Sequence, residues 1–419
     1  MEGTRDSAII VGRFSESDTA VGITLRNGAE LIAGNGILID IQTSIFNPAL
    51  KVHADVEVSN SQLRGDIRAH AGGTGTLALT DNAALVGGIT GAFDVTLDRG
   101  GRWLLTKSSD VGTLNMGDGG TVSLGDGSAF HTLNVAGNFI GNDGTIVFNT
   151  VLAGDDAATD KLIIGGDTRG RANVRVNNVG GAGAPTHKGI ELISIAGASN
   201  ATFSLVGRAV GGQYEYFLHK GTGADGNWYL RSQLPTVPDP CVADPSLPQC
   251  QPVDPVNPGD PANPVDPVNP VDPADPIEPV PVLRPEPGAY LANLQAAQTM
   301  FRLGYHDRQA GQNAGRAWAR VDGSRNGFDA VSTQLDIRGN SQALTVGADL
   351  WRHDSDSSVG VMLSSGNASS TSTNALTGYY ARGKVKGEAL GVYGTWRGGN
   401  GTDPYAGFYV DGSLQRAQF

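Results

Sequence analysis

Asn60-Ser61-Gln62-Leu63-Arg64-Gly65 is one copy of a theme that recurs along the N-terminal half of the chain. Related stretches are Asn27-Gly28-Ala29-Glu30-Leu31-Ile32, Asn82-Ala83-Ala84-Leu85-Val86-Gly87 and Gly100-Gly101-Arg102-Trp103-Leu104-Leu105. The last three copies begin about 20 residues apart, which is close to the length of one solenoid coil. In such a coil alternate side chains point into a narrow apolar core, and Gly or Asn occupies corners that need a positive φ. The repeat predicts a parallel β-helix.

The composition favours repeated β layers over a compact core. The chain has 419 residues, of which 60 are Gly, while only 6% are aromatic and 17% are charged. A globular β-sandwich is the competing fold, but it would usually carry more aromatic residues and hairpin turns. The sequence contains no apolar run of about 18 residues, so any membrane span must come from β-strands. We therefore expect an all-β protein.

A proline-rich acidic tract divides the chain. Residues 235–287 hold 18 of the 21 prolines, nine Asp or Glu residues and one basic residue, Arg284. Between Pro252 and Pro279 a Pro-x-x-Pro spacing suits polyproline II and predicts a stiff linker. A ligand for an SH3-type domain is the alternative function of this spacing. The net charge of −12, without clustered Lys or Arg, argues against nucleic acid as a partner.

Two cysteines, Cys241 and Cys250, stand at the start of this tract. We expect a small disulfide loop, as an oxidising compartment permits. A metal site would need more ligands, and no His lies in the tract. Elsewhere the His residues show no zinc-type spacing, and Gly125-Asp126-Gly127-Ser128 lacks the nucleophile elbow of hydrolases. The sequence thus predicts no enzyme activity, no cofactor, no metal and no small-molecule substrate.

Amphipathic segments follow the tract. Tyr290, Leu294, Ala297 and Phe301 recur at helical spacing and predict a short helix. Beyond it, apolar and polar residues alternate as in a transmembrane barrel strand. The apolar residues that we assign to the outward face are Val331, Leu335, Ile337, Leu344, Val346, Ala348, Leu350, Val359, Val361, Leu363, Phe408, Val410 and Leu414. Residues 384–396 are less clear, because charged and apolar side chains share one parity there.

Three short stretches carry a resemblance to a known family. They are Asn227-Trp228-Tyr229-Leu230-Arg231-Ser232, Gly288-Ala289-Tyr290-Leu291-Ala292-Asn293 and His306-Asp307-Arg308. Their sequences and their order along the chain are similar to those of the C-terminal part of bacterial autotransporters of the pertactin-like adhesin type, which use type V secretion. The resemblance implies a right-handed parallel β-helix passenger (1–129), a C-terminal stability cap (130–234), the Pro-rich linker (235–287), a pore helix (288–310) and the first strands of an outer-membrane β-barrel (311–419).

The resemblance also implies a location and partners. The passenger would lie at the cell surface or be secreted, and the barrel would enter the outer membrane with the help of the barrel-assembly machinery. A solenoid end exposes unpaired strand edges and needs a capping unit. We therefore assign Trp228 and Tyr229 as the apolar plug of the cap. His306-Asp307-Arg308 are expected to make polar contacts within the barrel lumen.

We further expect the chain to be a fragment. Met1-Glu2-Gly3-Thr4-Arg5-Asp6 shows no secretory signal. Only about five strands follow the helix, whereas the resemblance implies a barrel of about twelve, and an open sheet leaves unpaired edge groups in lipid. Parity places Phe419 on the lumen side with Tyr409. The sequence therefore predicts no displayed passenger unless a partner chain supplies the remaining strands.

Arg64-Gly65-Asp66 is the candidate receptor-binding site. In an exposed turn this tripeptide presents a guanidinium and a carboxylate on opposite sides of a Gly, the charge pair that integrins read, and some pertactin-like adhesins carry it. The alternative is a coil corner with solvated charges. We predict an adhesin that binds a host-cell receptor. The rival functions are the translocator and stalk of a secreted serine-protease-type enzyme whose catalytic domain is missing here, and a purely structural surface protein.

Overall fold

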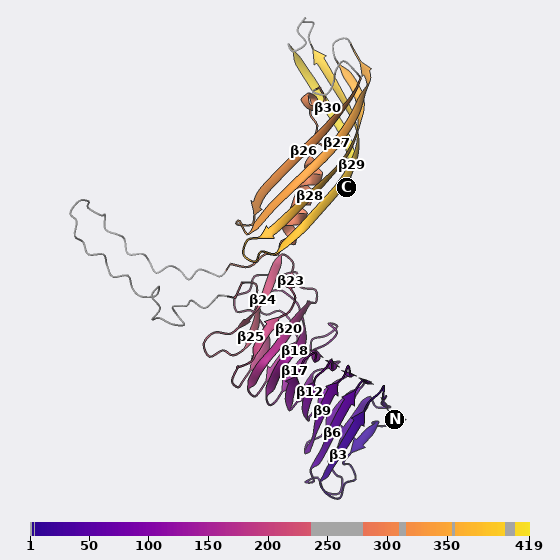
Figure 1. Ribbon diagram of the computed structural model, residues 1–419, viewed down its shortest axis with the longest axis vertical. Coiled ribbons are helices and arrows are strands. Elements are labelled where there is room, and N and C mark those ends of the chain that lie inside the picture. Colours follow the sequence, from indigo (N-terminus) through magenta and orange to yellow (C-terminus); the bar gives the residue numbers. More distant parts are fainter. Residues whose placement is uncertain (1, 4, 236–279, 310–315, 354–356, 399–406) are drawn as a thin grey trace, which may run out of the picture. The chain divides into compact units, whose positions relative to one another are not determined.

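The computed structural model describes residues 2–3, 5–235, 280–309, 316–353, 357–398 and 407–419. Cysteines 241 and 250 lie outside these residues. The chain divides into two compact units, Met1–Val282 and Leu283–Phe419. Short stacked strands build the first unit, and long strands with two helices build the second (Figure 1). No helix of the described residues has both the length and the apolar character needed to cross a membrane.

The first unit is a stack of parallel strands. Its largest sheet runs, in spatial order, through β3 (Thr19–Leu25), β6 (Val52–Ser59), β9 (Gly73–Thr80), β12 (Ala92–Leu97), β15 (Thr113–Met116), β18 (Phe139–Thr150), β16 (Thr121–Ser123), β13 (Arg102–Leu104), β10 (Ala84–Val86) and β7 (Gln62–Arg64), and it continues from β18 to β20 (Thr168–Asn178) and β22 (Thr202–Leu205). The repeated theme of the sequence supplies β7, β10 and β13.

Further sheets complete the coils. One contains β11 (Ile89–Thr90), β8 (Asp66–Ala69), β5 (Ile37–Ile41) and β2 (Ile9–Val11), and β1 (Glu2–Gly3) pairs with β4 (Ile32–Ala33). Another contains β14 (Ser109–Val111), β17 (Thr132–Val135), β19 (Lys161–Ile164), β21 (Ile190–Ile195), β25 (Trp228–Arg231), β24 (Tyr214–Lys220) and β23 (Ala209–Gly211). The predicted parallel β-helix is therefore confirmed.

Equivalent positions of successive coils stack directly on one another. Val56 pairs with Leu77, Leu77 with Val95, and Val95 with Leu114. All four side chains are at most 1% exposed. Because the strands are parallel and in register, one apolar position per coil builds a continuous core, and burying each such side chain stabilises the fold by about 1.5–3 kcal/mol.

The coil corners adopt the left-handed backbone that the sequence predicts. Asn60, Asn82 and Gly100 have φ values of 45°, 64° and 81°. Asn tolerates this region better than other residues with a side chain, and Gly does so freely. The backbone N–H of Asn60 donates to Asp81 and that of Asn82 to Arg99, so each corner is also hydrogen-bonded to the next coil.

The second unit is an antiparallel sheet. Its strands follow the chain order β26 (Ala317–Ala330), β27 (Leu335–Arg352), β28 (Ser358–Asn374), β29 (Tyr380–Gly398) and β30 (Phe408–Gln418). Helices α2 (Glu286–Thr299) and α3 (Tyr305–Gln309) precede them. We call the sheet face that contacts α2 the inner face and the opposite one the outer face.

The structure corrects the apolar stripe expected on the helix. Tyr290 and Leu294 are 69% and 57% exposed, while Gly288, Ala289 and Phe301 are buried. The helix approaches the sheet so closely that a Cβ on Gly288 would lie 2.2 Å from Ser372 Oγ. Within α2 the buried residues are thus the small Gly288 and Ala289, while Phe301, which follows the helix, is the large residue of the expected stripe that is buried. The segment expected as one helix over 288–310 is divided into α2 and α3.

Strand parity is also corrected in one place. Leu335 and Ile337, expected on the outward face, are each 1% exposed and lie on the inner face near α2. Leu344 and Val346 are exposed on the outer face, as predicted. The cause is that all four residues belong to one continuous strand, β27. Because successive side chains of a strand point to opposite faces, the odd-numbered Leu335 and Ile337 face inward and the even-numbered Leu344 and Val346 face outward. Val331 lies before this strand in a turn with positive φ, not in a strand.

Candidate functional site

The C-terminal end of the β-helix changes from parallel to antiparallel pairing. Strand β21 pairs in parallel with β19 on one side, but antiparallel with β25 on the other. β25 then pairs antiparallel with β24, and β24 with β23. These last strands end the magenta part of the stack in Figure 1. The outermost strand, β23, has only three residues, so little strand edge is left open at this end.

Trp228 seals the apolar core at this end. It is 8% exposed, and its ring meets Phe203 edge-on with centroids 5.3 Å apart. Phe203 in turn lies 5.4 Å from Phe139. The sequence identified Trp228 but not Phe203 and Phe139, because they stand 25 and 89 residues earlier in the chain. Within the described residues, Trp228 Nε1 is buried without a hydrogen-bond partner.

Tyr229 faces a polar environment instead. Its hydroxyl donates to Asp225 over 2.8 Å, and the charged ends of Lys188 and Arg231 lie 5.3 and 5.6 Å from its ring centroid. Burial and then the hydrogen bond to Asp225 raise the pKa of the Tyr229 hydroxyl to about 12. Neighbouring residues of a strand point to opposite faces. The two aromatic residues predicted as one plug thus have different roles. Trp228 fills the core, and Tyr229 holds the turn that precedes β25 through its hydrogen bond to Asp225.

Two sets of hydrogen bonds that the sequence did not reveal connect segments of the cap. The Tyr216 hydroxyl lies 2.8 Å from the Ala184 carbonyl and 3.0 Å from that of Ala153. The Asp155 carboxylate accepts the backbone N–H groups of residues 187, 188 and 189 at 2.9–3.0 Å. Although burial opposes it, these three donors lower the pKa of Asp155. The partners are between 32 and 63 residues apart, so only coil stacking brings them together.

Arg64-Gly65-Asp66 forms a coil corner between β7 and β8. Arg64 is exposed. Gly65 has a φ of 139°, and a Cβ there would lie 2.8 Å from the Gly36 carbonyl of the preceding coil. Only Gly fits this close approach. The corner is thus packed between neighbouring coils and does not form a protruding loop.

The Asp66 carboxylate is occupied by the two coils that follow. It accepts the Gly88 backbone N–H over 2.8 Å and forms an ion pair with Lys107. Its side chain is 26% exposed. Residues 66, 88 and 107 hold equivalent places on successive coils, so Asp66 links three of them. A receptor that reads this carboxylate must first displace Lys107.

The inner face of the second unit holds a polar network. The Tyr393 hydroxyl donates to Asp349 over 2.6 Å and accepts from Trp318 Nε1 over 2.9 Å. Arg308 of α3 is 3% exposed, pairs with Asp411 and lies 4.6 Å from the Tyr393 ring centroid. The helix segment is therefore anchored to β29 and β30 through charged and aromatic contacts.

Neighbouring residues extend these contacts. Asp307 pairs with Arg320 at 2.9 Å, and His306 Nε2 lies 3.1 Å from the Tyr409 hydroxyl. The inner-face position of Phe419 follows from its stacking on Phe301, with ring centroids 5.7 Å apart. The parity argument from the sequence had placed Phe419 on this side.

The outer face carries an apolar band. Its side chains are 42–75% exposed and come from β27 to β30: Leu344, Val346, Leu350, Val359, Leu363, Leu390, Val392, Trp396, Phe408, Val410 and Leu414. An exposed apolar surface of this kind marks contact with lipid or another protein. No cluster of His, Cys, Asp or Glu suited to a metal ion occurs among the described residues.

Comparisons with known proteins agree with this division of the chain. Residues 109–218 match the family model of the autochaperone domain type 1, and residues 317–419 match that of the autotransporter beta-domain. Together the two matched ranges cover about half of the chain.

Individual relatives point the same way. The chain is 37% identical over 303 residues to the uncharacterized protein YuaQ of Escherichia coli K12, across 68% of this chain and 20% of that protein. It is 28% identical over 297 residues to the autotransporter adhesin AIDA-I of Escherichia coli, across 67% and 20%. It is 38% identical over 211 residues to the adhesin BmaC autotransporter of Brucella suis, across 46% and 6%. The chain spans a fifth or less of these relatives.

Proposed function

Since the chain belongs to the autotransporter family, we propose that it forms part of a surface-displayed adhesin and that its own C-terminal domain carries the passenger. One observation supports this most directly. A β-helix that ends in a sealed cap and a sheet with an apolar outer face occur in the same chain, in the order of a passenger and its carrier. The autochaperone match falls on the first and the β-domain match on the second.

The β-domain makes the chain an outer-membrane protein whose passenger is displayed or secreted. Insertion through the barrel-assembly machinery is part of the proposal. The apolar band suits lipid, since its exposed side chains lose contact with water only in a membrane or an interface. The domain limits expected from the sequence, with a cap at 130–234, stand as a proposal beside the matched range 109–218.

We propose that the chain itself catalyses no reaction. AIDA-I and BmaC are both named as adhesins. In the cap, the acidic residues with shifted pKa values bind backbone N–H groups of other loops. The Asp155 carboxylate, for example, accepts three such hydrogen bonds. A stalk for an enzyme domain further upstream is the less favoured alternative.

Adhesion is tested with the full chain, purified in detergent and coupled to polystyrene beads. We expect these beads to attach to epithelial cells more often than beads with an equal mass of serum albumin, and soluble chain to compete. Equal attachment of the two kinds of bead would contradict the adhesin function. A stalk without adhesive surface would give that result.

Receptor contact through Arg64-Gly65-Asp66 remains a narrower proposal. The exposure of Arg64 supports this proposal, whereas the hydrogen bond from Gly88 and the ion pair with Lys107 at Asp66 oppose it. Two variants separate the alternatives. If a receptor reads the carboxylate, Asp66→Asn abolishes bead attachment, while Lys107→Ala frees the carboxylate and keeps or increases attachment. If the tripeptide only links coils, attachment stays unchanged in both variants.

A further inference from the structure

A cluster of positive charges borders the apolar band on the outer face of the second unit. It consists of the exposed residues Arg325 of β26, Arg338 of β27, and Arg382, Lys384 and Lys386 of β29. We call it the basic patch. The strand register places Arg338 beside Thr371 and Thr371 beside Arg382. With neighbouring strands about 4.8 Å apart, Arg338 and Arg382 flank Thr371 on the same face of the sheet.

A groove with a volume of about 730 Å³ lies in this patch. Four cations line it, Arg325, Arg338, Arg382 and Lys384, and its other lining residues are Gly, Ser, Thr and Asn. Among the residues that the structure describes, no acidic side chain lines the groove. Asp336 pairs with Arg338 at 2.7 Å from beside it. The groove therefore combines positive charge, which Asp336 offsets at Arg338, with hydroxyl and amide donors, the chemistry that binds phosphate.

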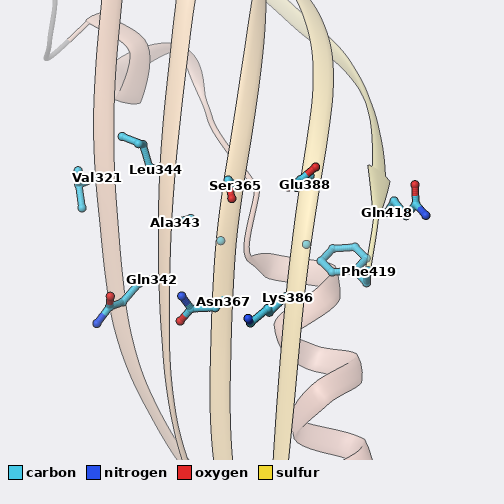
Figure 2. Close-up of a pocket in the computed structure, with 12 residues that line it drawn as sticks. Val321, Gln342, Ala343, Leu344, Ser365, Asn367, Lys386, Glu388, Gln418 and Phe419 are labelled. Carbon is cyan, nitrogen blue, oxygen red and sulfur yellow. The ribbon is translucent and has the colours of Figure 1, made fainter.

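The polarity of the outer face changes along the strands. Figure 2 shows the row Gln342, Asn367 and Lys386, and beside it the row Leu344, Ser365 and Glu388. Two residues further along, Val346, Leu363 and Leu390 are in register and belong to the apolar band. A second groove of about 510 Å³ runs between these apolar residues. Glu388 marks the junction between the polar and apolar parts.

The basic patch lies at the end of the strands where the chain enters the second unit. The Leu283 backbone N–H donates to the Gln334 side chain, and its carbonyl accepts from Asn374 Nδ2. Gln334 directly precedes the start of β27 and Asn374 is the last residue of β28, so both stand at the end of the strands that carries the patch. The chain therefore joins this unit at the patch end. If the passenger is displayed outside, this half of the sheet faces the outer leaflet, and this leaflet assignment alone rests on the proposed function.

We propose that this surface binds a phosphorylated lipid, with its phosphate in the groove of the basic patch and its acyl chains on the apolar band. A soluble polyanion would cover the cations but leave the adjoining apolar residues in water. An amphiphile with a phosphate head matches both parts at once. Because the cations are exposed, each contributes modestly and the binding is weakened by salt.

The test uses the full chain in non-ionic detergent micelles and a bis-phosphorylated, acylated glucosamine disaccharide as the probe. The variant R338Q/R382Q/K384Q removes three cations from the groove. The matched control, R102Q/R169Q/R175Q, removes three exposed cations from the β-helix. We expect the groove variant to bind roughly ten-fold more weakly and the control to bind like the parent chain. Raising the salt concentration should reduce the difference.

Three results would overturn the proposal. One is equal affinity of the parent chain and the groove variant for the probe. Another is equal binding of the probe after enzymatic removal of its phosphates. The third is binding of inorganic phosphate without binding of the lipid, which would show an anion site only. Far-UV circular dichroism checks the fold, and the single charge reversal K384E, at an exposed position, decides the matter if the triple variant misfolds.

Discussion

The β-helix and the β-domain use the same alternation of apolar and polar residues with opposite results. Val56, Leu77 and Val95 are at most 1% exposed in the β-helix, whereas Leu390 and Leu414 in the β-domain are 60% and 75% exposed. In the β-helix the chain coils around its own apolar side chains. In the β-domain the inner face is covered by α2 and holds the polar network with a few buried apolar residues such as Leu335 and Ile337, whereas the apolar band lies on the outer face.

The comparison shows that alternation fixes two faces but not which of them is buried. Strand length is the better guide. The coil strands contain between 2 and 12 residues, whereas β27, β28 and β29 contain between 17 and 19. Long strands of this kind suit a membrane span or its extension, while short strands between corners suit a coil.

The largest expected effect lies where the β-helix core ends. Trp228→Ala should lower the free energy of unfolding of the β-helix by about 3–5 kcal/mol, because it leaves a cavity against Phe203. Trp228→Phe should cost much less, since the indole N–H has no partner among the described residues. Urea unfolding followed by circular dichroism measures both.

Trp396→Ala in the β-domain is the matched control, because that side chain is 54% exposed. Its effect on unfolding in detergent should be below about 1 kcal/mol. A similar loss for the Trp228 and Trp396 variants would refute the proposed division into an inward and an outward apolar face. The capping role also predicts slower refolding for Trp228→Ala.

A second pair of variants compares a buried leucine of the β-helix with an exposed leucine of the β-domain. Leu77→Ala removes a fully buried side chain and should destabilise the β-helix by about 2–5 kcal/mol. Leu390→Ala should change unfolding by less than about 0.5 kcal/mol but reduce partition of the chain into lipid vesicles. Limited proteolysis reports the first and vesicle flotation the second. Unchanged flotation of the Leu390 variant would argue against a lipid-facing band.

Acidification should loosen the cap through Asp155. Its pKa is lowered in the folded chain from the ordinary value of 3.8, so its stabilising effect is present above that value and is lost as the pH falls below it. At pH 7, Asp155→Asn should cost about 1–3 kcal/mol, because a charged acceptor of three N–H groups is replaced. The difference between the two proteins should shrink as the pH falls below 3.8 and through the lowered pKa of Asp155 in the folded chain. A constant difference down to pH 3 would show that charge plays no part.

The smallest effect is expected at the coil corner. Lys107→Ala should lower the stability of the β-helix by at most about 1 kcal/mol, since the ion pair with Asp66 is partly exposed. Asp66→Asn should cost somewhat more, because the Gly88 backbone N–H also depends on this carboxylate. Thermal unfolding curves of the two variants provide the measurement. The reverse order would mean that the ion pair outweighs the backbone contact.

Much of the fold could be predicted from the sequence because its signals are local. The spacing of the theme around Leu63, Leu85 and Trp103 predicted the stacked coils, and all three side chains are buried in register. Asn and Gly at the corners indicated positive φ values, because these residue types tolerate the left-handed region better than others. The short aromatic stretch at Trp228 marked the end of the β-helix.

The sequence failed where an answer depends on contacts between distant residues. The helical spacing of Tyr290 and Leu294 suggested a buried stripe, but the close approach at Gly288 leaves both exposed. Leu335 and Ile337 were assigned to the wrong face because the continuity of β27 was not recognised. The engagement of Asp66 by Lys107 could not be foreseen from a tripeptide that, by itself, suggests a receptor ligand.

The sequence by itself determined the strand alternation, the coil length and the division of the chain by a proline-rich tract, because backbone preferences and side-chain periodicity act over a few residues. Only the tertiary structure decided which apolar face is enclosed, which aromatic residues meet at the cap and how the cations of β26, β27 and β29 gather beside an apolar band. These features require strands 20 to 90 residues apart to lie in a defined register. That register results from packing the whole domain and cannot be read from any single segment.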